Sequence, residues 1–178
     1  MTEVFATERL VLRELEDADA NFIHQLYTGS DFRRAIGDRG ISSLADAADY
    51  LKKVLQNSYR EHGFGLWLME FEGQGVGVCG LVKRDYLPVP DLGFALVPEA
   101  YGQGFAREAA AACLSYARAE LGLPELLAIA SMDNEASHKL LQAVGFKPNG
   151  MIIEPRSKES LCCFRWTARW TEEGLNAN

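Results

Sequence analysis

The segment from Asp91 to Leu121 constrains the fold most, because its apolar pattern changes from that of a strand to that of a helix across a loop of small residues. Residues 91–97 (DLGFALV) have the length and composition of a strand. From Gly104 onward, apolar side chains recur at helical spacing, at Ala106, Ala109, Ala110, Cys113, Leu114, Ala117 and Leu121. Gly122 and Pro124 end this helix. The chain therefore contains a strand–loop–helix unit with glycines just before the helix.

Segments of strand and helix length surround this unit, and no repeat or linker divides the chain. Further strands are predicted at residues 9–15, Phe64–Glu72, Val76–Arg84, Leu126–Met132, Phe146–Ile153 and Leu161–Trp170. Further helices are predicted from Asp17 to Gly29, from the capping Ser43 to Gly63, and from Glu135 to Val144. The sequence GQG at 73–75 is predicted to form a hairpin turn. This order is typical of an α/β (α+β) fold, in which a mixed seven-stranded sheet is flanked by about four helices.

The charge of the chain argues against nucleic-acid and membrane partners. Its 178 residues include 25 acidic and 18 basic side chains, which gives a net charge of −7. No run of five basic residues supplies the concentrated positive field that a phosphate-rich surface attracts. Glu3, Glu8 and Arg9 interrupt the apolar stretch that a signal peptide needs, and no apolar run approaches 18 residues. We expect one domain over residues 1–170, a polar tail over 171–178 and a cytoplasmic location.

The cysteine pattern predicts neither a metal site nor a disulfide framework. Cys79, Cys113, Cys162 and Cys163 form no CxxC pair, and no histidine stands at metal-ligand spacing from them. Free cysteine is commonly a core residue. We therefore expect no metal and four buried, reduced thiols.

The glycine-rich loop VPEAYGQGFAREA (97–109) is the segment that predicts chemistry. The first N–H groups of a helix lack internal partners and carry partial positive charge, so a tight loop before a helix can hold phosphates. Taken alone, the glycine pattern also fits a purely structural connection. A Rossmann loop fails on context, because PEAY separates the strand from the glycines and Arg107 stands where the third small residue belongs. A Walker loop fails because Gly-Lys-Ser/Thr is absent.

Three segments, in order, resemble the GNAT N-acetyltransferases. DLGFALVPEAYGQGFAREA is similar to their acetyl-CoA-binding motif, with Tyr101 at the Q/R position of Q/R-x-x-G-x-G/A. DNEASHKLLQAVGF (133–146) resembles their Asn-x-x-Ser…Gly-Phe segment. TERLVLREL (7–15) is similar to the first strand of the ribosomal-protein N-terminal acetyltransferase (RimJ/RimL-like) subgroup. The resemblance implies a GNAT-type mixed, mostly antiparallel sheet and an enzyme that uses acetyl-CoA.

The resemblance also implies which residues hold the co-substrate. The pyrophosphate of CoA is expected on the backbone of Gly102, Gln103, Gly104, Phe105, Ala106 and Arg107. The pantetheine arm is expected beside Phe94, Leu96 and Val97, with hydrogen bonds from Asn134 and proximity to Ser137. Arg107 is equally consistent with a solvated first-turn side chain, and Asn134 is also a good helix cap.

For catalysis, the resemblance implies direct attack of an amine on the acetyl thioester. Ser137 is a candidate for protonating the departing thiolate, since Leu141 stands where many relatives have a tyrosine. Asp91 and Glu70 are candidate bases, and each is also consistent with a solvated strand-end carboxylate. His138 lies beside the motif without a partner pattern. Backbone N–H groups near Leu96 are candidates for stabilising the tetrahedral oxyanion.

The leading acceptor is the α-amine of a peptide or protein N-terminus, because an amine that titrates near 7.7–8.0 needs only a modest base. A small amine, such as an amino acid, polyamine or aminoglycoside, is the alternative acceptor, and a CoA-binding module without catalysis is the alternative class. Phe32, Arg33, Arg34 and Arg39 mark the expected acceptor region, where the arginines either bind an acidic acceptor or are solvated. Both a monomer and a homodimer are compatible with the sequence.

Overall fold

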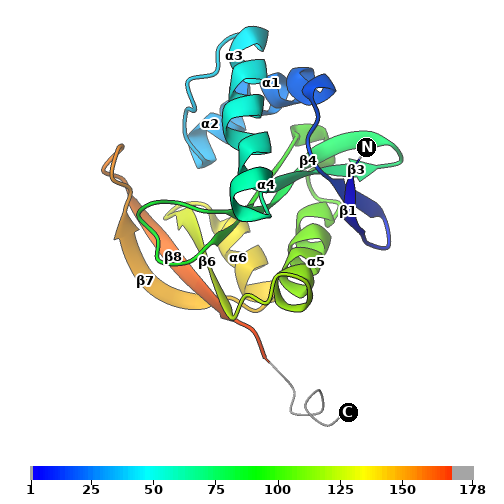
Figure 1. Ribbon diagram of the computed structural model, residues 1–178. Coiled ribbons are helices and arrows are strands. Elements are labelled where there is room, and N and C mark those ends of the chain that lie inside the picture. The colour runs from blue at the N-terminus through cyan, green and yellow to red at the C-terminus, as the bar shows by residue number, and fades with distance from the viewer. Residues whose placement is uncertain (1, 170–178) are drawn as a thin grey trace, which may run out of the picture.

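Within residues 2–169, which the computed structural model describes, eight strands form one sheet in the order β1-β2-β3-β4-β5-β6-β8-β7 (Figure 1). The strands are β1 Glu3–Ala6, β2 Leu10–Arg13, β3 Leu66–Phe71, β4 Gln74–Val82, β5 Asp91–Leu96, β6 Glu125–Ser131, β7 Lys147–Ile153 and β8 Ser160–Thr167. The helices are α1 Ala20–Thr28, α2 Ser30–Ala35, α3 Leu44–Tyr50, α4 Asn57–His62, α5 Phe105–Ala119 and α6 Glu135–Ala143. Short 3-10 turns at Asp17–Asp19 and Pro98–Ala100 precede α1 and α5.

The sheet is mixed and mostly antiparallel, as predicted. Every neighbouring pair is antiparallel except β5 and β6, which run parallel. Those two strands share a single register pair, Asp91 with Leu127. On its other side, β5 pairs with β4 along its whole length, from Asp91 opposite Val82 to Leu96 opposite Gly77. The two parallel strands therefore part immediately after β5 begins.

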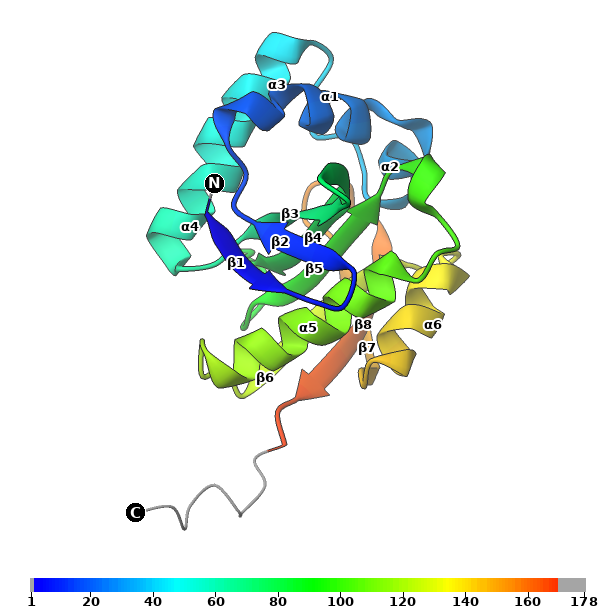
Figure 2. The same ribbon diagram turned by 90° about the vertical axis from the view of Figure 1, so that its right-hand side faces the viewer.

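Helices cover both faces of the sheet (Figure 2). One core cluster packs α5 and α6 against strand residues such as Cys79 and Leu92. A second cluster packs α1, α2 and α3 against Val78 on the other face, with Ala95 at its margin. Strand residues alternate between the two faces. Asp91 therefore shares the α1–α3 side with Ala95, while Leu92 and Phe94 face α5.

Several elements differ from the sequence predictions. The chain forms an additional edge strand, β1, and an additional short helix, α2, both too short for a periodic signal. The helix predicted from Ser43 to Gly63 is present as one rod, with a π-helical segment at Leu51–Gln56 between α3 and α4. The helix predicted from Asp17 begins with the 3-10 turn, where the Asp17 carboxylate accepts a hydrogen bond from Gln56 and pairs with Lys52.

The predicted GQG turn at 73–75 is wrong by one position, because Phe71 pairs with Gln74 and leaves Glu72-Gly73 as the turn. Both turn residues have positive φ, 50° and 78°, as a type I′ hairpin requires. The tail at 171–178 and Trp170 lie outside the described residues. Among residues 2–169, no helix combines the length and hydropathy needed to cross a membrane.

Candidate active site

The parting of β5 and β6 leaves one edge of β5 without a strand partner beyond its first residue. Phe94, Leu96 and Val97, the three residues predicted to lie along the pantetheine arm, are half-buried at this edge. Backbone groups that a neighbouring strand would otherwise satisfy are thus available to an extended ligand. This β5–β6 junction is the feature around which the other predicted residues gather.

The glycine-rich loop ends at the N-terminus of α5, close to where the sequence predicts it. Gly102 and Gly104 have φ of 74° and 81°, a conformation that glycine adopts without strain. Gly104 is the N-cap residue of α5, and no side chain caps the helix there. The N–H groups of Phe105, Ala106 and Arg107 therefore lack intrahelical partners. Gln103 and Arg107 are exposed, whereas the side chains of Phe105 and Ala106 are buried. Only the backbone of Phe105 and Ala106 is therefore directed toward the loop.

Arg9 braces this loop from the turn between β1 and β2, a role that the sequence reasoning missed. Its Nη1 donates to the Gln103 carbonyl at 2.9 Å, and its Nε donates to Glu108 at 2.7 Å. The guanidinium also stacks on Phe105, 4.7 Å from the ring centroid. Although partial burial opposes it, hydrogen bonds from Thr7 and Arg9 lower the pKa of Glu108. The only sequence feature that could have indicated this role is the position of Arg9 inside the TERL segment.

The start of α6 places Asn134 and Ser137 beside the end of β6. The Asn134 Oδ1 accepts a hydrogen bond from the Ser137 N–H at 3.2 Å, so Asn134 caps the helix as the sequence allows. This contact uses the amide oxygen and leaves the NH2 group of Asn134 available to donate. Both residues are half-buried. His138 turns away to the backbone, with its Nε2 2.9 Å from the Ser131 carbonyl oxygen.

Asp91 is buried at the β5–β6 junction, with 1% of its surface exposed. The Arg84 Nε lies 3.0 and 3.2 Å from its two carboxylate oxygens. Burial raises the pKa of Asp91 to about 6, and the Arg84 charge partly offsets that rise. The alternative of a solvated strand-end carboxylate is contradicted for Asp91. A carboxylate with this pKa can both accept and release a proton near neutral pH.

Glu70 is not brought to the junction. It lies on β3, from which β4 separates β5, and its carboxylate accepts a hydrogen bond from the Arg13 Nε at 2.9 Å. Arg13 also donates to Asp19, so the three side chains form a largely buried ion network. Glu70 is therefore neither solvated nor close to the residues around Asp91.

Helix α2 connects the loop, the sheet and the predicted acceptor region. The Tyr101 hydroxyl donates to Asp31 at 3.3 Å, and the Ser131 hydroxyl donates to the Ala35 carbonyl at 3.2 Å. These contacts place α2 beside both the glycine-rich loop and the end of β6. Phe32 is buried against Tyr27, with ring centroids 4.2 Å apart, so it belongs to the core.

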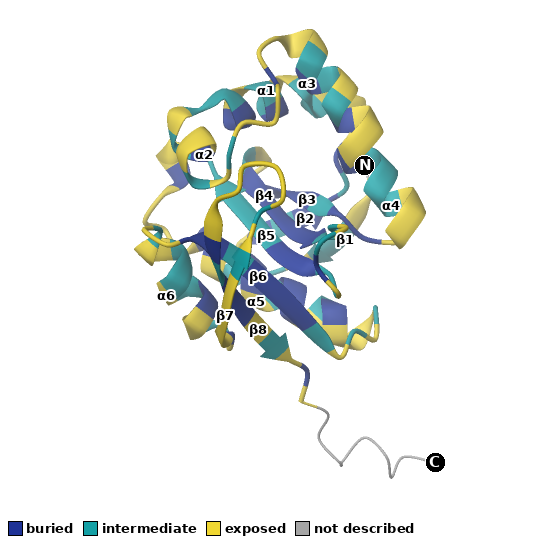
Figure 3. Cartoon of the chain, turned by 90° about the vertical axis from the view of Figure 1, so that its left-hand side faces the viewer, coloured by how far each residue is buried: buried dark blue, intermediate teal, exposed yellow. Residues whose placement is uncertain are grey.

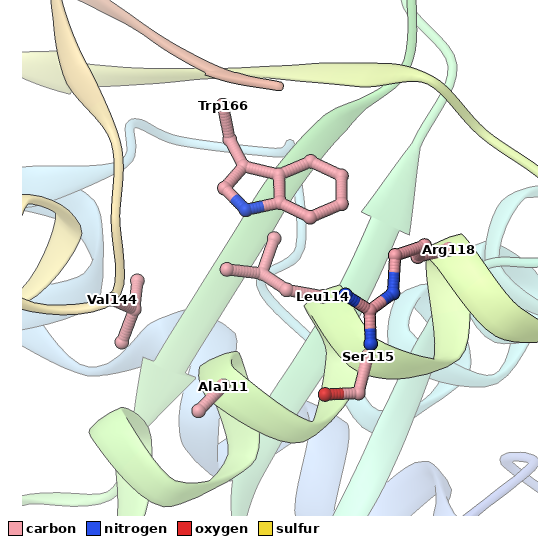
Figure 4. A pocket seen from close by; sticks show the side chains of 6 residues that line it. All are labelled: Ala111, Leu114, Ser115, Arg118, Val144 and Trp166. Carbon is pink, nitrogen blue, oxygen red and sulfur yellow. The ribbon is translucent and has the colours of Figure 1, made fainter. Parts of the chain in front are cut away.

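A separate hollow of about 200 Å³ lies farther along α5 (Figure 4). It is lined by Ala111, Leu114, Ser115, Arg118, Val144 and Trp166. These residues belong to the middle and C-terminal half of α5, to β8 and to the end of α6. The hollow is therefore distinct from the helix N-termini at Gly104 and Asn134.

The cysteines belong to the packing of the fold. Cys79 and Cys113 face each other in the core with their sulfurs 3.5 Å apart, Cys163 is buried, and Cys162 is half-buried. Burial raises the pKa of Cys113 well above its usual value, which keeps it a neutral thiol. Among residues 2–169, no three His, Cys, Asp or Glu side chains are grouped to hold a metal ion.

Comparison with known proteins places the chain in a family. The acetyltransferase (GNAT) domain profile matches residues 9–147. The uncharacterized N-acetyltransferase YoaA of Bacillus subtilis is 27% identical over 157 residues, which is 85% of this chain and 87% of YoaA. RimL, a ribosomal L7/L12 alpha-N-protein acetyltransferase solved with coenzyme A, superposes with a TM-score of 0.80 at 13% identity over 93% of this chain and 97% of its own. A spermidine N-acetyltransferase SpeG chimera from Vibrio cholerae and hSSAT superposes with a TM-score of 0.74 at 20% identity, covering 96% and 100% of the two chains. With a family profile that spans most of its length, the chain belongs to the GNAT acetyltransferase family and is an N-acetyltransferase.

Proposed function

We propose that this N-acetyltransferase takes its acetyl group from acetyl-CoA and transfers it to the α-amine of a peptide or protein N-terminus. The observation that carries the proposal is the unpaired edge of β5 beside the uncapped N-terminus of α5. The first suits an extended arm that pairs with backbone, and the second suits a phosphate group. A pantetheine attached to a pyrophosphate combines both.

The co-substrate is proposed to contact main chain more than side chain. The N–H groups from Gly102 to Arg107 would receive the pyrophosphate, which the partial positive charge of the helix end favours. The edge of β5 at Phe94, Leu96 and Val97 would pair with the amide groups of the arm. Asn134 would donate its free NH2 group to a carbonyl of the arm, since its Oδ1 is used by Ser137.

In the proposed reaction, the amine nitrogen bonds to the thioester carbonyl carbon and the carbon–sulfur bond breaks. The bound α-ammonium gives one proton to Asp91 before the attack. The leaving thiolate takes a proton from Ser137, and the Ser137 hydroxyl regains a proton from the nitrogen as the amide forms. With the pKa of Asp91 at about 6, proton transfer from an α-ammonium of pKa near 8 is uphill by about 3 kcal/mol. The same transfer from a lysine-type ammonium of pKa near 10.4 is uphill by about 6 kcal/mol. This difference supports an α-amine acceptor.

A small-molecule amine is the second candidate acceptor. The likeness in fold to both RimL and the SpeG chimera supports each type of acceptor equally. The two candidates predict opposite preferences between peptides and small amines in an acetyl-transfer assay.

The first experiment measures CoA-thiol release from acetyl-CoA with short peptides of varied first residues and with a panel of small amines. An enzyme-only blank corrects for the four cysteines of the chain. We expect turnover with peptides and a mass increase of one acetyl group on the α-amine. Turnover with small amines alone would refute the peptide acceptor. A failure of the protein to bind CoA would refute the co-substrate.

The Asn134→Asp and Asn134→Ala variants test the contact to the arm. Aspartate keeps an oxygen for the helix cap but has no NH2 donor, whereas alanine loses both. We expect both variants to raise the KM for acetyl-CoA about tenfold, which corresponds to one hydrogen bond. We expect only the alanine variant to lower the melting temperature. An unchanged KM in the aspartate variant would leave Asn134 with the capping role alone.

A further inference from the structure

The side chains around Asp91 carry more positive than negative charge. Arg84 binds the Asp91 carboxylate through its Nε. Arg39 lies within electrostatic reach of Asp91 and is a hydrogen-bonding neighbour of the Tyr50 hydroxyl. The charges of two guanidinium groups thus act on one carboxylate, although the whole chain has a net charge of −7.

Tyrosines complete this cluster without adding charge. Tyr27 and Tyr50 pack with their ring centroids 5.4 Å apart, and Tyr86 neighbours Arg84. Burial raises the pKa of Tyr27 and of Tyr50, so both remain neutral at physiological pH. The excess positive charge near Asp91 is therefore not balanced by phenolates.

The cluster lies on the side of the sheet opposite to α5. Asp91 shares its face of β5 with Ala95, which packs toward α1–α3. Helix α5, which the glycine-rich loop precedes, packs on the other face. The hydrogen bond between Ser131 and Ala35 places the end of α2 beside β6, and Arg39 stands four residues farther along the chain. If the nucleotide end of acetyl-CoA occupies the α5 side, the acceptor approaches the junction from the side of Arg39 and Arg84.

The arginines near α2 differ in how they are used. Arg34 forms an exposed ion pair with Asp31 at 2.9 Å, and Arg33 donates to the Ile41 carbonyl at 2.9 Å. Asp38, next to Arg39, accepts a hydrogen bond from the Gly40 N–H at 2.8 Å. Within residues 2–169, Arg39 has no carboxylate within 4.0 Å, and Arg84 binds Asp91 through Nε rather than through its two terminal nitrogens. Each guanidinium also has a tyrosine hydroxyl beside it, Tyr50 for Arg39 and Tyr86 for Arg84. A guanidinium has five N–H donors, and those not directed at Asp91 or at these hydroxyls are left for a ligand.

We infer that the acceptor carries a carboxylate close to its primary amine, and that Arg39 and Arg84 bind this carboxylate while the amine reaches the β5–β6 junction. The inference rests on the proposed transfer from acetyl-CoA to an amine. An acidic side chain at the first or second position of a peptide meets the requirement, and so does the α-carboxylate of a free amino acid. A polyamine does not, because it would add positive charge to a cluster that already has an excess.

The test compares kcat/KM for three peptides that differ only at the second residue, which is glutamate, glutamine or lysine. We expect the wild-type enzyme to prefer glutamate over glutamine by about tenfold or more, as a charge-assisted hydrogen bond would give. The Arg39→Gln variant should reduce that preference to about twofold. The Arg39→Glu variant should invert it and favour the lysine peptide, which loss of a purely structural side chain would not do. Arg34→Gln is the matched control, because its side chain is 78% exposed and already paired with Asp31.

Free glutamate and spermidine are assayed in parallel. Glutamate tests whether the carboxylate belongs to a free amino acid rather than to a peptide, and spermidine tests an acceptor of the opposite charge. Acetylation of glutamate with no transfer to peptides would keep the inference and refute the peptide acceptor. Equal rates for the three peptides, or a preference for spermidine, would overturn the inference while leaving acetyl transfer intact. A charge preference that persists in Arg39→Gln and Arg39→Glu would also overturn it. Absence of transfer to every amine would overturn the proposed function, and the inference with it.

Discussion

The Asp91→Asn variant separates the charge of Asp91 from its shape and its position at the start of β5. The amide can still accept a hydrogen bond from Arg84, so the variant should fold and bind acetyl-CoA like the wild type. A general base typically contributes a factor of about 10²–10⁴, and we expect a loss of that size in kcat/KM at pH 7.5. The measurement is acetyl transfer to one peptide from pH 5 to pH 8, with both enzymes assayed side by side.

The informative quantity is the ratio of kcat/KM for the wild type to kcat/KM for the variant, because titration of the peptide amine affects both enzymes equally. With a pKa of about 6, nearly all of Asp91 is ionised at pH 7.5 and about one-tenth at pH 5. The ratio should therefore fall about tenfold between those two values. Because Arg84 favours the ionised carboxylate, the Arg84→Met variant should move this transition to higher pH. A ratio that stays constant from pH 5 to pH 7.5 would refute the use of Asp91 as a base.

Four other variants test the loop and the sheet. Gly102→Ala and Gly122→Ala each place alanine at a positive φ in open space, which should lower the free energy of unfolding by about 1–2 kcal/mol. Only Gly102→Ala should raise the KM for acetyl-CoA, and an equal rise of KM in both variants would show that backbone strain alone matters. Arg9→Met should lower the free energy of unfolding by about 1 kcal/mol, since the pair with Glu108 is partly exposed, and should raise the KM for acetyl-CoA several-fold. Thermal melting and titration with CoA check these two effects. An unchanged KM would limit Arg9 to a packing role. Gly80→Ala should destabilise the protein by about 3 kcal/mol or more, because its Cβ would lie 2.0 Å from the Gly65 carbonyl oxygen; an unchanged urea midpoint would contradict this.

The parts of the site that depend on local backbone signals could be predicted from the sequence. Gly104 marks the start of α5 because glycine tolerates the positive φ of that turn. Asn134 marks the start of α6 because its side chain caps the next turn. The order of strand-length and helix-length segments predicted a mixed sheet flanked by helices, whereas its mostly antiparallel pairing was implied by the resemblance to the GNAT N-acetyltransferases.

The parts that depend on tertiary pairing could not be predicted. The burial of Asp91 requires Arg84, which reaches it across the loop between β4 and β5. A contact of this kind has no periodic pattern in the sequence that would predict it. Likewise, Glu70 looked accessible from its strand but is paired with Arg13 on β2. The turn at Glu72-Gly73 was missed because glutamate seldom occupies a positive φ, so the neighbouring glycine pattern pointed one residue too far.

The single bridge between β5 and β6 also has a consequence for how the chain folds and opens. It divides the sheet into a five-stranded block, β1–β5, and a three-stranded block formed by β6, β8 and β7, whose edge strand is largely exposed (Figure 3). Each block contains hairpins with short sequence separation, which form earlier than long-range pairings. We expect the two blocks to join late in folding. In the native protein, amide hydrogens on the unpaired edge of β5 should exchange with solvent without any prior opening of the sheet, well before those of β4, which has a partner on both sides.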